Sequence, residues 1–230
     1  MKSVKTTFIK TLPVMAGYLV LGAGFGILLK VNGYGVFWTF LMSFFIYAGS
    51  MQFVGISLLT SGASLISVAI TTLMVNARHL FYGISMIERY KGAGKKKFYL
   101  MHTLTDETYS LVCTGDVPEG MDPHKYYLFV SAFNHSYWVL GSVVGSLIGS
   151  VLSFDTAGID FAMTALFVTV FIEQWLATKE HRPALIGVGA SVVCLLVFGS
   201  DRFLIPTMVL IIIILTAVRR MLEKAGVQNE

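Results

Sequence analysis

The longest uncharged stretch of the chain lies between Lys30 and Arg78, where 47 consecutive residues include no Lys, Arg, Asp or Glu. A single helix of that length would run roughly 70 Å, whereas the hydrocarbon core of a bilayer is only about 30 Å thick. The stretch therefore predicts two membrane crossings joined by a turn, and Ser61-Gly62 is the candidate for that turn.

The rest of the chain has the same character. Of its 230 residues, 55% are hydrophobic and 13% are charged, and the mean hydropathy is +0.73. A soluble domain carries about 25% charged residues, so we predict an all-α integral membrane protein whose main surroundings are the lipid bilayer. The net charge of +4 lies in short loops and at the ends, a pattern that excludes a nucleic-acid binder. Cys113 and Cys194 lie in apolar stretches and do not indicate a disulfide framework.

Charge-free gaps of this kind predict about seven transmembrane helices. The expected spans are 13–29, 36–59, 64–87, 126–152, 160–177, 184–199 and 203–218. Residues 98–113 are not counted, because two adjacent carboxylates would cost about 2.5–3.5 kcal/mol each at the centre of a lipid-exposed helix. We expect this segment to lie at the interface or to dip into a wet cavity.

The first span follows Lys2, Lys5 and Lys10 and so resembles a secretory signal sequence. Almost everything downstream is also predicted to lie in the membrane. We therefore expect this segment to be retained as the first transmembrane helix.

Three pairs of segments match in order at a nearly constant offset, which predicts an internal duplication. YLVLGAGFG from Tyr18 matches YWVLGSVVG from Tyr137, and two further pairs of spans align. Phe45, Gln52 and Phe53 align with Phe167, Gln174 and Trp175, and Leu65, Ile66 and Val68 align with Leu185, Ile186 and Val188.

Three crossings would separate each residue from its counterpart if 98–113 does not cross, so the halves are expected to form a 3+3 inverted repeat. The expected organisation is one polytopic domain, 1–230, with halves at 13–87 and 126–199, a connecting segment at 88–125 and a final helix at 203–218. The positive-inside rule then places the 88–97 loop and the C-terminus in the cytoplasm and the N-terminus outside, which leaves three lysines on the unfavoured side.

Polar residues inside apolar segments are the candidates for substrate binding or ion coupling, because each needs a partner there. Arg78 cannot lose its proton, so it either snorkels to the interface, pairs with an acid or faces water. Asp106 is either a solvated loop acid or a cavity-lining carboxylate that pairs with Arg78 or takes a proton. Glu173 either ends its span at the interface or carries a coupling proton. The full set is Ser50, Gln52, Asn76, Arg78, His79, Tyr82, Asp106, Glu107, Asn134, His135, Glu173 and Gln174.

The chain has no G-x-S-x-G, H-E-x-x-H or Walker motif, so neither a hydrolase nor an ATPase is indicated. His79, His102 and His135 have no metal-site spacing, and we expect neither a metal nor another cofactor.

The motifs AGSMQF (48–53), NARHLFYG (76–83) and LTDETY (104–109), with an aliphatic last span, resemble the AzlC family of branched-chain amino acid permeases. The resemblance runs from about Thr11 to Arg220. It implies export of valine, leucine or isoleucine across a bacterial inner membrane, and a separate small membrane subunit of the AzlD type. It assigns functional positions to Gln52, Asn76, Arg78, His79, Asp106 and Glu107. A homo-oligomer, a membrane scaffold and an ion-channel subunit remain open from the sequence.

Overall fold

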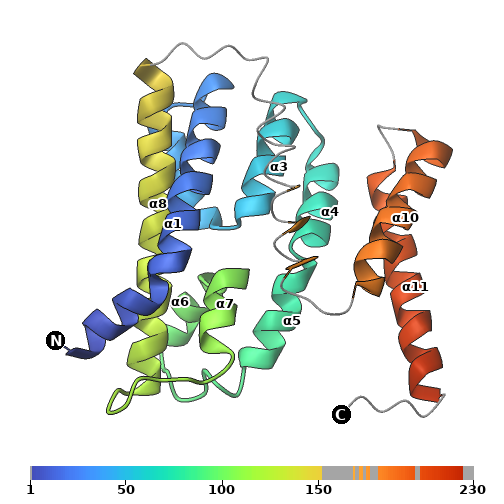
Figure 1. The fold of residues 1–230 in the computed structure, drawn as a ribbon. Coiled ribbons are helices and arrows are strands. Elements are labelled where there is room, and N and C mark those ends of the chain that lie inside the picture. Colours follow the sequence, from blue (N-terminus) through green and yellow to red (C-terminus); the bar gives the residue numbers. More distant parts are fainter. Residues whose placement is uncertain are drawn as a thin grey trace. The chain divides into compact units, whose positions relative to one another are not determined.

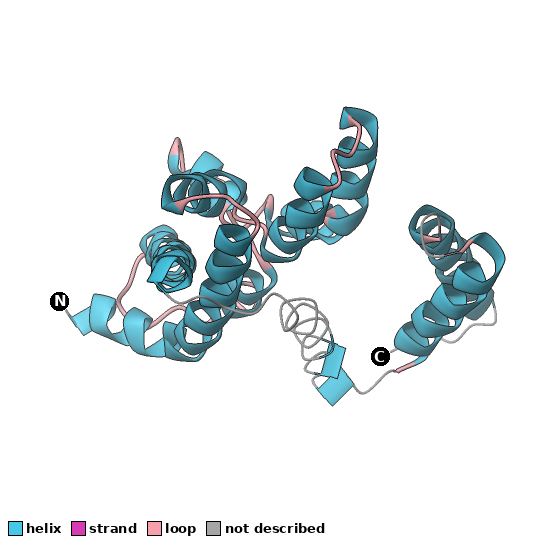
Figure 2. Ribbon diagram, turned by 90° about the horizontal axis from the view of Figure 1, so that it is seen from above, coloured by secondary structure: helices cyan, strands magenta, loops and turns pink. Residues whose placement is uncertain are grey.

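A computed structural model of the protein describes residues 2–151, 168, 171–172, 175–176, 181–199 and 203–224. Within these ranges the chain consists of helices and loops, and it has no strand (Figures 1 and 2). The chain divides into two units, Met1–Met163 and Thr164–Glu230. The all-α class predicted from the composition is confirmed for the described residues.

Two long helices that lie side by side form the centre of the first unit, α1 (Lys2–Val31) and α8 (Pro123–Val151) (Figure 1). Glycines form their contact: a Cβ atom added at Gly26 would collide with the backbone of α8, and one added at Gly145 would collide with the backbone of α1. Small residues let membrane helices approach closely and gain packing energy. The glycines shared by the two matched segments therefore serve this contact.

A glycine substitution tests this packing. We expect Gly26→Ala to destabilise the folded protein by about 1–3 kcal/mol, because the new methyl group meets backbone atoms that cannot rotate away. Gly24→Ala is the matched control, since a Cβ atom there meets nothing within 4 Å and alanine favours a helix by about 1 kcal/mol. Thermal unfolding in detergent compares the two variants, and equal midpoints would contradict the close contact.

The predicted crossing at 36–59 is wrong, because the chain enters and turns back. It consists of α2 (Val36–Leu41), a π-helical turn η1 (Met42–Ile46) and α3 (Gly49–Thr60). A 12-residue helix such as α3 spans roughly 18 Å, which is only about half of a bilayer core. The segment is therefore a hairpin of two half-length helices, and we call it the first hairpin.

Contacts along the hairpin fix the directions of its two limbs. Thr39 Oγ1 bonds Ser146 Oγ at 3.1 Å, and Phe44 O lies 3.2 Å from Nε2 of His135, so the first limb runs against α8. The second limb runs with α1, because Tyr47 packs on Tyr18 and Phe53 packs on Phe25.

The reversal occurs at Tyr47, whose φ of 44° is the only positive value among the non-glycine residues of the described chain. Such a conformation is costly for a residue with a side chain and persists only where the surroundings hold it. Tyr47 is 4% exposed, so the irregular backbone is covered by protein, as membrane depth requires.

The predicted span 64–87 is present as two helices, α4 (Leu65–Val75) and α5 (Ala77–Met86), with a bend of 49° between them. The break is at Asn76, which ends α4 and precedes α5. By length and composition, α1 could cross a membrane, and the bent pair could form a second crossing.

A second hairpin occupies the segment 98–113, for which the sequence predicts no ordinary crossing. It contains α6 (Lys96–His102) and α7 (Asp106–Val112), which lie beside the lower half of α8 (Figure 1). Its second limb runs against α8, because Asn134 Nδ2 donates to Thr108 Oγ1 and Tyr126 Oη donates to the carbonyl of Leu111. The prediction that 98–113 does not form an ordinary crossing is therefore confirmed.

The two matched helices α1 and α8 run in the same direction. Gly141 faces Tyr18, and Gly149 faces Ile27 and Lys30, so residue numbers rise together along both helices. An inverted repeat would set these segments antiparallel. The expected inversion is therefore wrong for this pair, and the cause is that the first hairpin returns instead of crossing.

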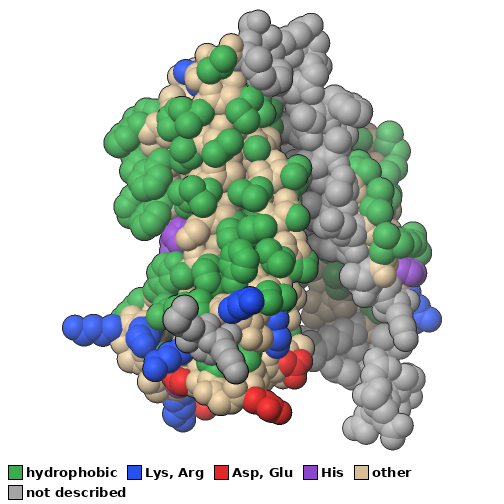
Figure 3. Space-filling view, turned by 60° about the vertical axis from the view of Figure 1, so that its left-hand side comes forward, with side chains coloured by type: hydrophobic (Ala, Val, Ile, Leu, Met, Phe, Trp, Pro, Cys, Tyr) green, Lys and Arg blue, Asp and Glu red, His purple; other side chains and the backbone are tan. Residues whose placement is uncertain are grey.

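The same return changes the expected distribution of charge. The N-terminal end of α1 lies beside the loop after α7, where Lys10 Nζ donates to the carbonyl of Asp116. Lysine and arginine side chains gather at this end of the unit, below an apolar surface (Figure 3). The expectation that the N-terminus lies opposite the 88–97 loop is wrong, because the start of α1, with Lys5 and Lys10, lies at the same end of the unit as that loop.

In the second unit, the predicted spans 184–199 and 203–218 correspond to α10 (Arg182–Phe198) and α11 (Leu204–Lys224). Gly187 of α10 faces Ile211 of α11, as in two antiparallel helices joined by a short turn. Most of the predicted span 160–177 lies outside the described residues.

Candidate functional site

The tips of the two hairpins meet beside the middle of α8. The carbonyl of Phe44, near the end of the first limb of the first hairpin, lies 3.4 Å from Nε2 of His102 at the tip of the second. Half-helices that meet inside a membrane protein bring free backbone groups and helix dipoles to one place. This junction is therefore the candidate site.

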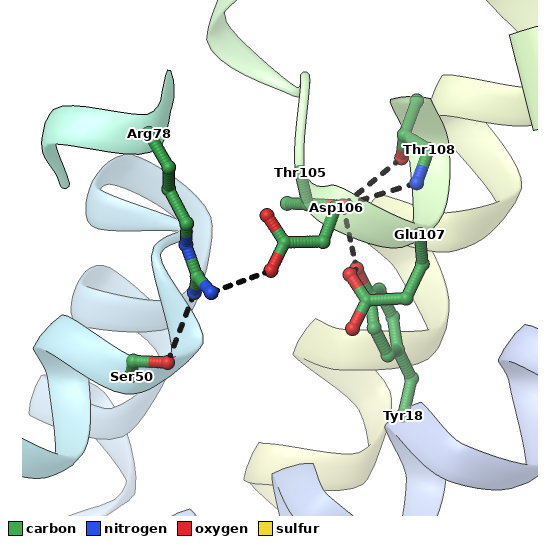
Figure 4. Close-up of polar contacts among 7 residues, drawn as sticks. All are labelled: Tyr18, Ser50, Arg78, Thr105, Asp106, Glu107 and Thr108. Atoms are coloured by element: carbon green, nitrogen blue, oxygen red, sulfur yellow. Dashed lines mark hydrogen bonds and ion pairs between the residues drawn. The ribbon is translucent and has the colours of Figure 1, made fainter. Parts of the chain in front are cut away.

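An ion pair ties α5 to the second hairpin at this junction. Arg78 Nη1 lies 2.7 Å from Asp106 Oδ2, and Nη2 donates to Ser50 Oγ at 3.2 Å (Figure 4). The pairing of Arg78 with Asp106, one of the alternatives drawn from the sequence, is confirmed. The side chains are 34% and 29% exposed, respectively, so each is more buried than exposed.

Helix ends set the electrostatics around the pair. Arg78 lies in the first turn of α5, and Ser50 lies in the first turn of α3, which has no capping side chain. Both turns carry the partial positive charge of a helix N-terminus. Asp106 and Glu107 lie in the first turn of α7, where acids are favoured. The junction therefore has a positive side and a negative side that face each other.

Glu107 points away from the ion pair and into a buried network (Figure 4). Tyr18 Oη donates to its Oε2 at 2.6 Å and also bonds Thr105 Oγ1 at 2.7 Å. Thr105 bonds Thr108, which accepts from Asn134 Nδ2 at 3.1 Å. The two neighbouring acids thus have different partners.

Gln52 lies in the first hairpin and is 1% exposed. Its Oε1 accepts from Trp138 Nε1 at 2.9 Å, whereas its Nε2 has no partner within the described part of the chain. Gly49 packs on the same indole ring, with the Cβ position 3.2 Å from Cη2 of Trp138. Gln52 thus links α3 to α8, and the N–H donors of its Nε2 remain free to bond another group.

His135 is held from two sides. Its Nδ1 lies 3.1 Å from Tyr99 Oη, and its Nε2 lies 3.2 Å from the carbonyl of Phe44. The ring of His102 lies 6.1 Å from that of His135. Among the residues that the structure describes, no three His, Cys, Asp or Glu side chains gather as metal ligands would.

Three further candidates lie along the bent helix pair. Asn76 is at the break between α4 and α5, so it does not share one continuous helical face with His79. His79 packs on Tyr82 with ring centroids 6.1 Å apart, and Tyr82 stacks on Tyr109 of α7 at 4.5 Å. Tyr82 therefore adds an aromatic contact between α5 and the second hairpin.

Of the predicted candidates, two lie outside the described residues, Glu173 and Gln174. The polar side chains at the site that are not among the predicted candidates are Tyr18, Tyr99, Thr105, Thr108 and Trp138. One available signal was Tyr18, which interrupts an apolar span at the position matched by Tyr137. Both tyrosines bond polar groups on other helices, since Tyr137 Oη bonds Thr11 Oγ1 at 3.0 Å.

Comparison with known protein families shows that residues 13–152 match the AzlC protein family. The Bacillus subtilis protein named branched-chain amino acid transport protein AzlC is 46% identical over 97% of this chain and 88% of its own length. A Haemophilus influenzae protein described as an uncharacterized membrane protein is 45% identical over 94% of this chain and 88% of its own length.

A more distant relative is the Escherichia coli inner membrane protein YgaZ, 29% identical over 87% of this chain and 82% of its own length. No solved structure matches the chain.

Proposed function

The chain belongs to the AzlC family of membrane proteins, and we propose that it is a secondary transporter that exports branched-chain amino acids across a bacterial inner membrane. The family is one of transport proteins rather than enzymes. The B. subtilis relative is named for branched-chain amino acid transport, and the E. coli relative is named as an inner membrane protein. These names support the substrate and the location proposed here.

The observation that carries the proposal is the Arg78–Asp106 ion pair where two half-length hairpins meet. Charges inside a membrane protein are expensive and usually mark the path of a substrate or an ion. Broken helices that meet near the middle of the membrane are the usual substrate sites of secondary transporters. We place the substrate site at this junction, with Ser50, Gln52, Arg78 and Asp106 as its polar residues.

A branched-chain amino acid suits such a site chemically. Its carboxylate needs a cation or a helix N-terminus, and its ammonium needs a carboxylate or free carbonyl groups. Its side chain needs an apolar wall, which aromatic residues such as Tyr47 and Trp138 supply beside the junction. An apolar pocket separates side chains that differ by one methylene by only about 1–3 kcal/mol. We therefore expect valine, leucine and isoleucine to share the site.

Flux of labelled valine in liposomes that contain the purified chain tests the proposal. Saturable uptake that unlabelled leucine and isoleucine reduce is the expected result. An ohmic ion current without valine flux would instead indicate an ion-channel subunit, and neither activity, with or without the partner subunit, would indicate a scaffold. Liposomes loaded from one side give the direction.

The partner proposed is a small AzlD-type membrane subunit, with a homo-oligomer as the alternative. Large apolar side chains on the first hairpin are exposed, among them Phe37 at 67% and Phe45 at 64%. Lipid or a protein partner can cover them. Valine flux with and without the co-expressed small subunit decides whether this chain needs it.

We propose that the chain has an internal duplication in which the first helices of the two halves, α1 and α8, run in the same direction. The crossings proposed are α1, the bent pair α4–α5, α8 and the three predicted spans 160–177, 184–199 and 203–218. The N-terminus, the 88–97 loop and the C-terminus then all face the cytoplasm, in agreement with the positive-inside rule.

Cysteine labelling in intact cells checks this arrangement, after Cys113 and Cys194 have been replaced by serine. We expect an impermeant reagent to label Asn32→Cys and not Lys95→Cys, because the two exposed positions lie at opposite ends of α1 and of the bent pair. Seven crossings would put both positions inside. An unlabelled Asn32→Cys that reacts once the membrane is opened would therefore restore the crossing at 36–59.

A further inference from the structure

The ion pair at the hairpin junction uses only some of the hydrogen-bonding groups of Arg78 and Asp106. One nitrogen of Arg78 contacts one oxygen of Asp106, at 2.7 Å. Nε of Arg78 and Oδ1 of Asp106 are both buried and have no partner within the described part of the chain. Arginine and a carboxylate commonly pair through two parallel bonds, and buried polar atoms normally have partners. A cation and an anion that each keep an open bonding group are suited to a ligand that carries both charges.

The surroundings of the two partners favour the same ligand. Arg78 is backed by the first turn of α5 and by Ser50 in the uncapped first turn of α3, so an anion that replaced Asp106 would still meet positive groups. Asp106 has no lysine, arginine or histidine other than Arg78 within ion-pair distance in the described ranges. A cation that replaced Arg78 would therefore be the counter-ion of Asp106.

We propose that the headgroup of an α-amino acid opens this ion pair and takes both places in it. The substrate carboxylate binds Arg78 and Ser50 in place of Asp106, and the substrate ammonium binds Asp106 in place of Arg78. The inference rests on the proposed function and adds to it the chemical group that is recognised, the zwitterionic α-amino and α-carboxyl pair.

Glu107 is the neighbouring acid that could otherwise take the ammonium. Its Oε2 accepts from Tyr18 Oη at 2.6 Å, within the network that continues through Thr105. Opening this network would leave the phenol of Tyr18, which is 4% exposed, with fewer partners. Asp106 can change partner with no such loss, because its present partner is a charge that the substrate carboxylate satisfies.

The exchange makes a specific demand on the ligand. A zwitterion leaves both Arg78 and Asp106 paired, so the two partly buried charges remain compensated throughout. A ligand with one charge must break the pair and leave one partner without a counter-ion, which is costly for side chains that are only 34% and 29% exposed. Isovalerate, which is valine without its ammonium, and isobutylamine, which is valine without its carboxylate, should therefore bind the wild-type chain at least about tenfold more weakly than valine.

Isovalerate and isobutylamine each carry half of the zwitterion, and we call them the half-ligands. Removing one partner of the ion pair should strengthen the binding of one half-ligand and weaken the binding of valine. In Asp106→Asn, Arg78 is left without a counter-ion, so isovalerate should bind about tenfold more tightly than it binds the wild type, and valine more weakly. In Arg78→Gln, the same argument predicts a gain for isobutylamine. Glu88→Gln is the control, because this carboxylate is 80% exposed and its one ion pair within the described part of the chain is with Lys91.

Calorimetric titration of the purified full chain with valine, isovalerate and isobutylamine measures all of these affinities. Tighter binding of isovalerate by Asp106→Asn, or of isobutylamine by Arg78→Gln, than by the wild type supports the exchange. If one variant does not fold, the result from the other variant decides. Loss of all three ligands in both folded variants overturns it and makes the pair a structural tie.

Failure of the exchange and failure of the proposed function give different results. A wild type that transports valine while neither variant gains a half-ligand keeps the function and loses the exchange. A wild type without valine binding or flux loses the function. In that case the affinities of Asp106→Asn for isovalerate and of Arg78→Gln for isobutylamine still decide whether a charged ligand competes with the ion pair.

Discussion

Replacing Arg78 by lysine is expected to reduce valine flux nearly as much as replacing it by alanine, by about tenfold to a hundredfold in each case. Arg78 bonds Asp106 and Ser50 through two different nitrogens and keeps Nε buried beside them. A lysine has a single ammonium group on a flexible stem and does not reproduce this planar fork. Initial rates of labelled valine flux, normalised to the folded protein recovered, measure the effect.

Arg89→Lys is the matched control for this substitution. Arg89 Nη1 donates to one backbone carbonyl, that of Val112, at 3.2 Å, and an ammonium group can make the same bond. We expect its flux to stay close to that of the wild type. If Arg78→Gln kept both expression and flux, Arg78 would be only an anchor at the membrane interface.

The membrane class and most helices follow from the distribution of charge. The helices α1, α8, α10 and α11 each enclose a predicted span or cover all but one residue of it, because a long uninterrupted apolar run is typical of a membrane-spanning helix. The first hairpin could not be predicted in the same way. A single crossing over 36–59 and two half-length helices that turn back bury the same apolar residues. The reversal takes place at Tyr47 itself, whereas the nearest glycine, Gly49, follows it by two residues and lies in the first turn of α3.

One sequence signal did point to the hairpin. A crossing at 36–59 left Lys2, Lys5 and Lys10 on the side that basic residues avoid, whereas the returning hairpin places the start of α1 with the 88–97 loop. A charge distribution that fits badly is evidence that one predicted crossing does not occur.

The candidate site could be predicted only as far as charge is informative. Placing the charges of Arg78 and Asp106 in an apolar chain costs free energy unless they pair, so the sequence predicts their contact. The structure shows this contact. The bond between Tyr18 and Glu107 is different, because it joins residues that are 89 positions apart. A tyrosine in such a helix can either pack against apolar neighbours or bond a polar partner, and the fold decides which of the two occurs.

Replacing Gln52 by leucine is expected to lower valine affinity by about 1–3 kcal/mol and also to weaken the fold. The sequence match with Gln174 first suggested a role in binding, and the structure adds a second role. Oε1 of Gln52 accepts from Trp138, so Gln52→Leu leaves a buried indole N–H without a partner, whereas the free Nε2 is the group available to a substrate. Valine binding and thermal unfolding of the variant measure the two losses, with Gln174→Leu compared beside it.

A double-mutant cycle with Trp138→Phe separates the two roles of Gln52. Phenylalanine keeps an aromatic ring against Phe25 and Tyr18 and needs no hydrogen-bond acceptor. If Gln52 only satisfies Trp138, then Gln52→Leu should cost almost nothing in the Trp138→Phe background, because the two changes remove one shared bond. If Nε2 of Gln52 binds the substrate, stability should recover in the double variant while valine affinity stays low. Wild-type affinity in Gln52→Leu, Gln174→Leu and the double variant would mean that these amides only pack helices, and the substrate site would then have to lie elsewhere.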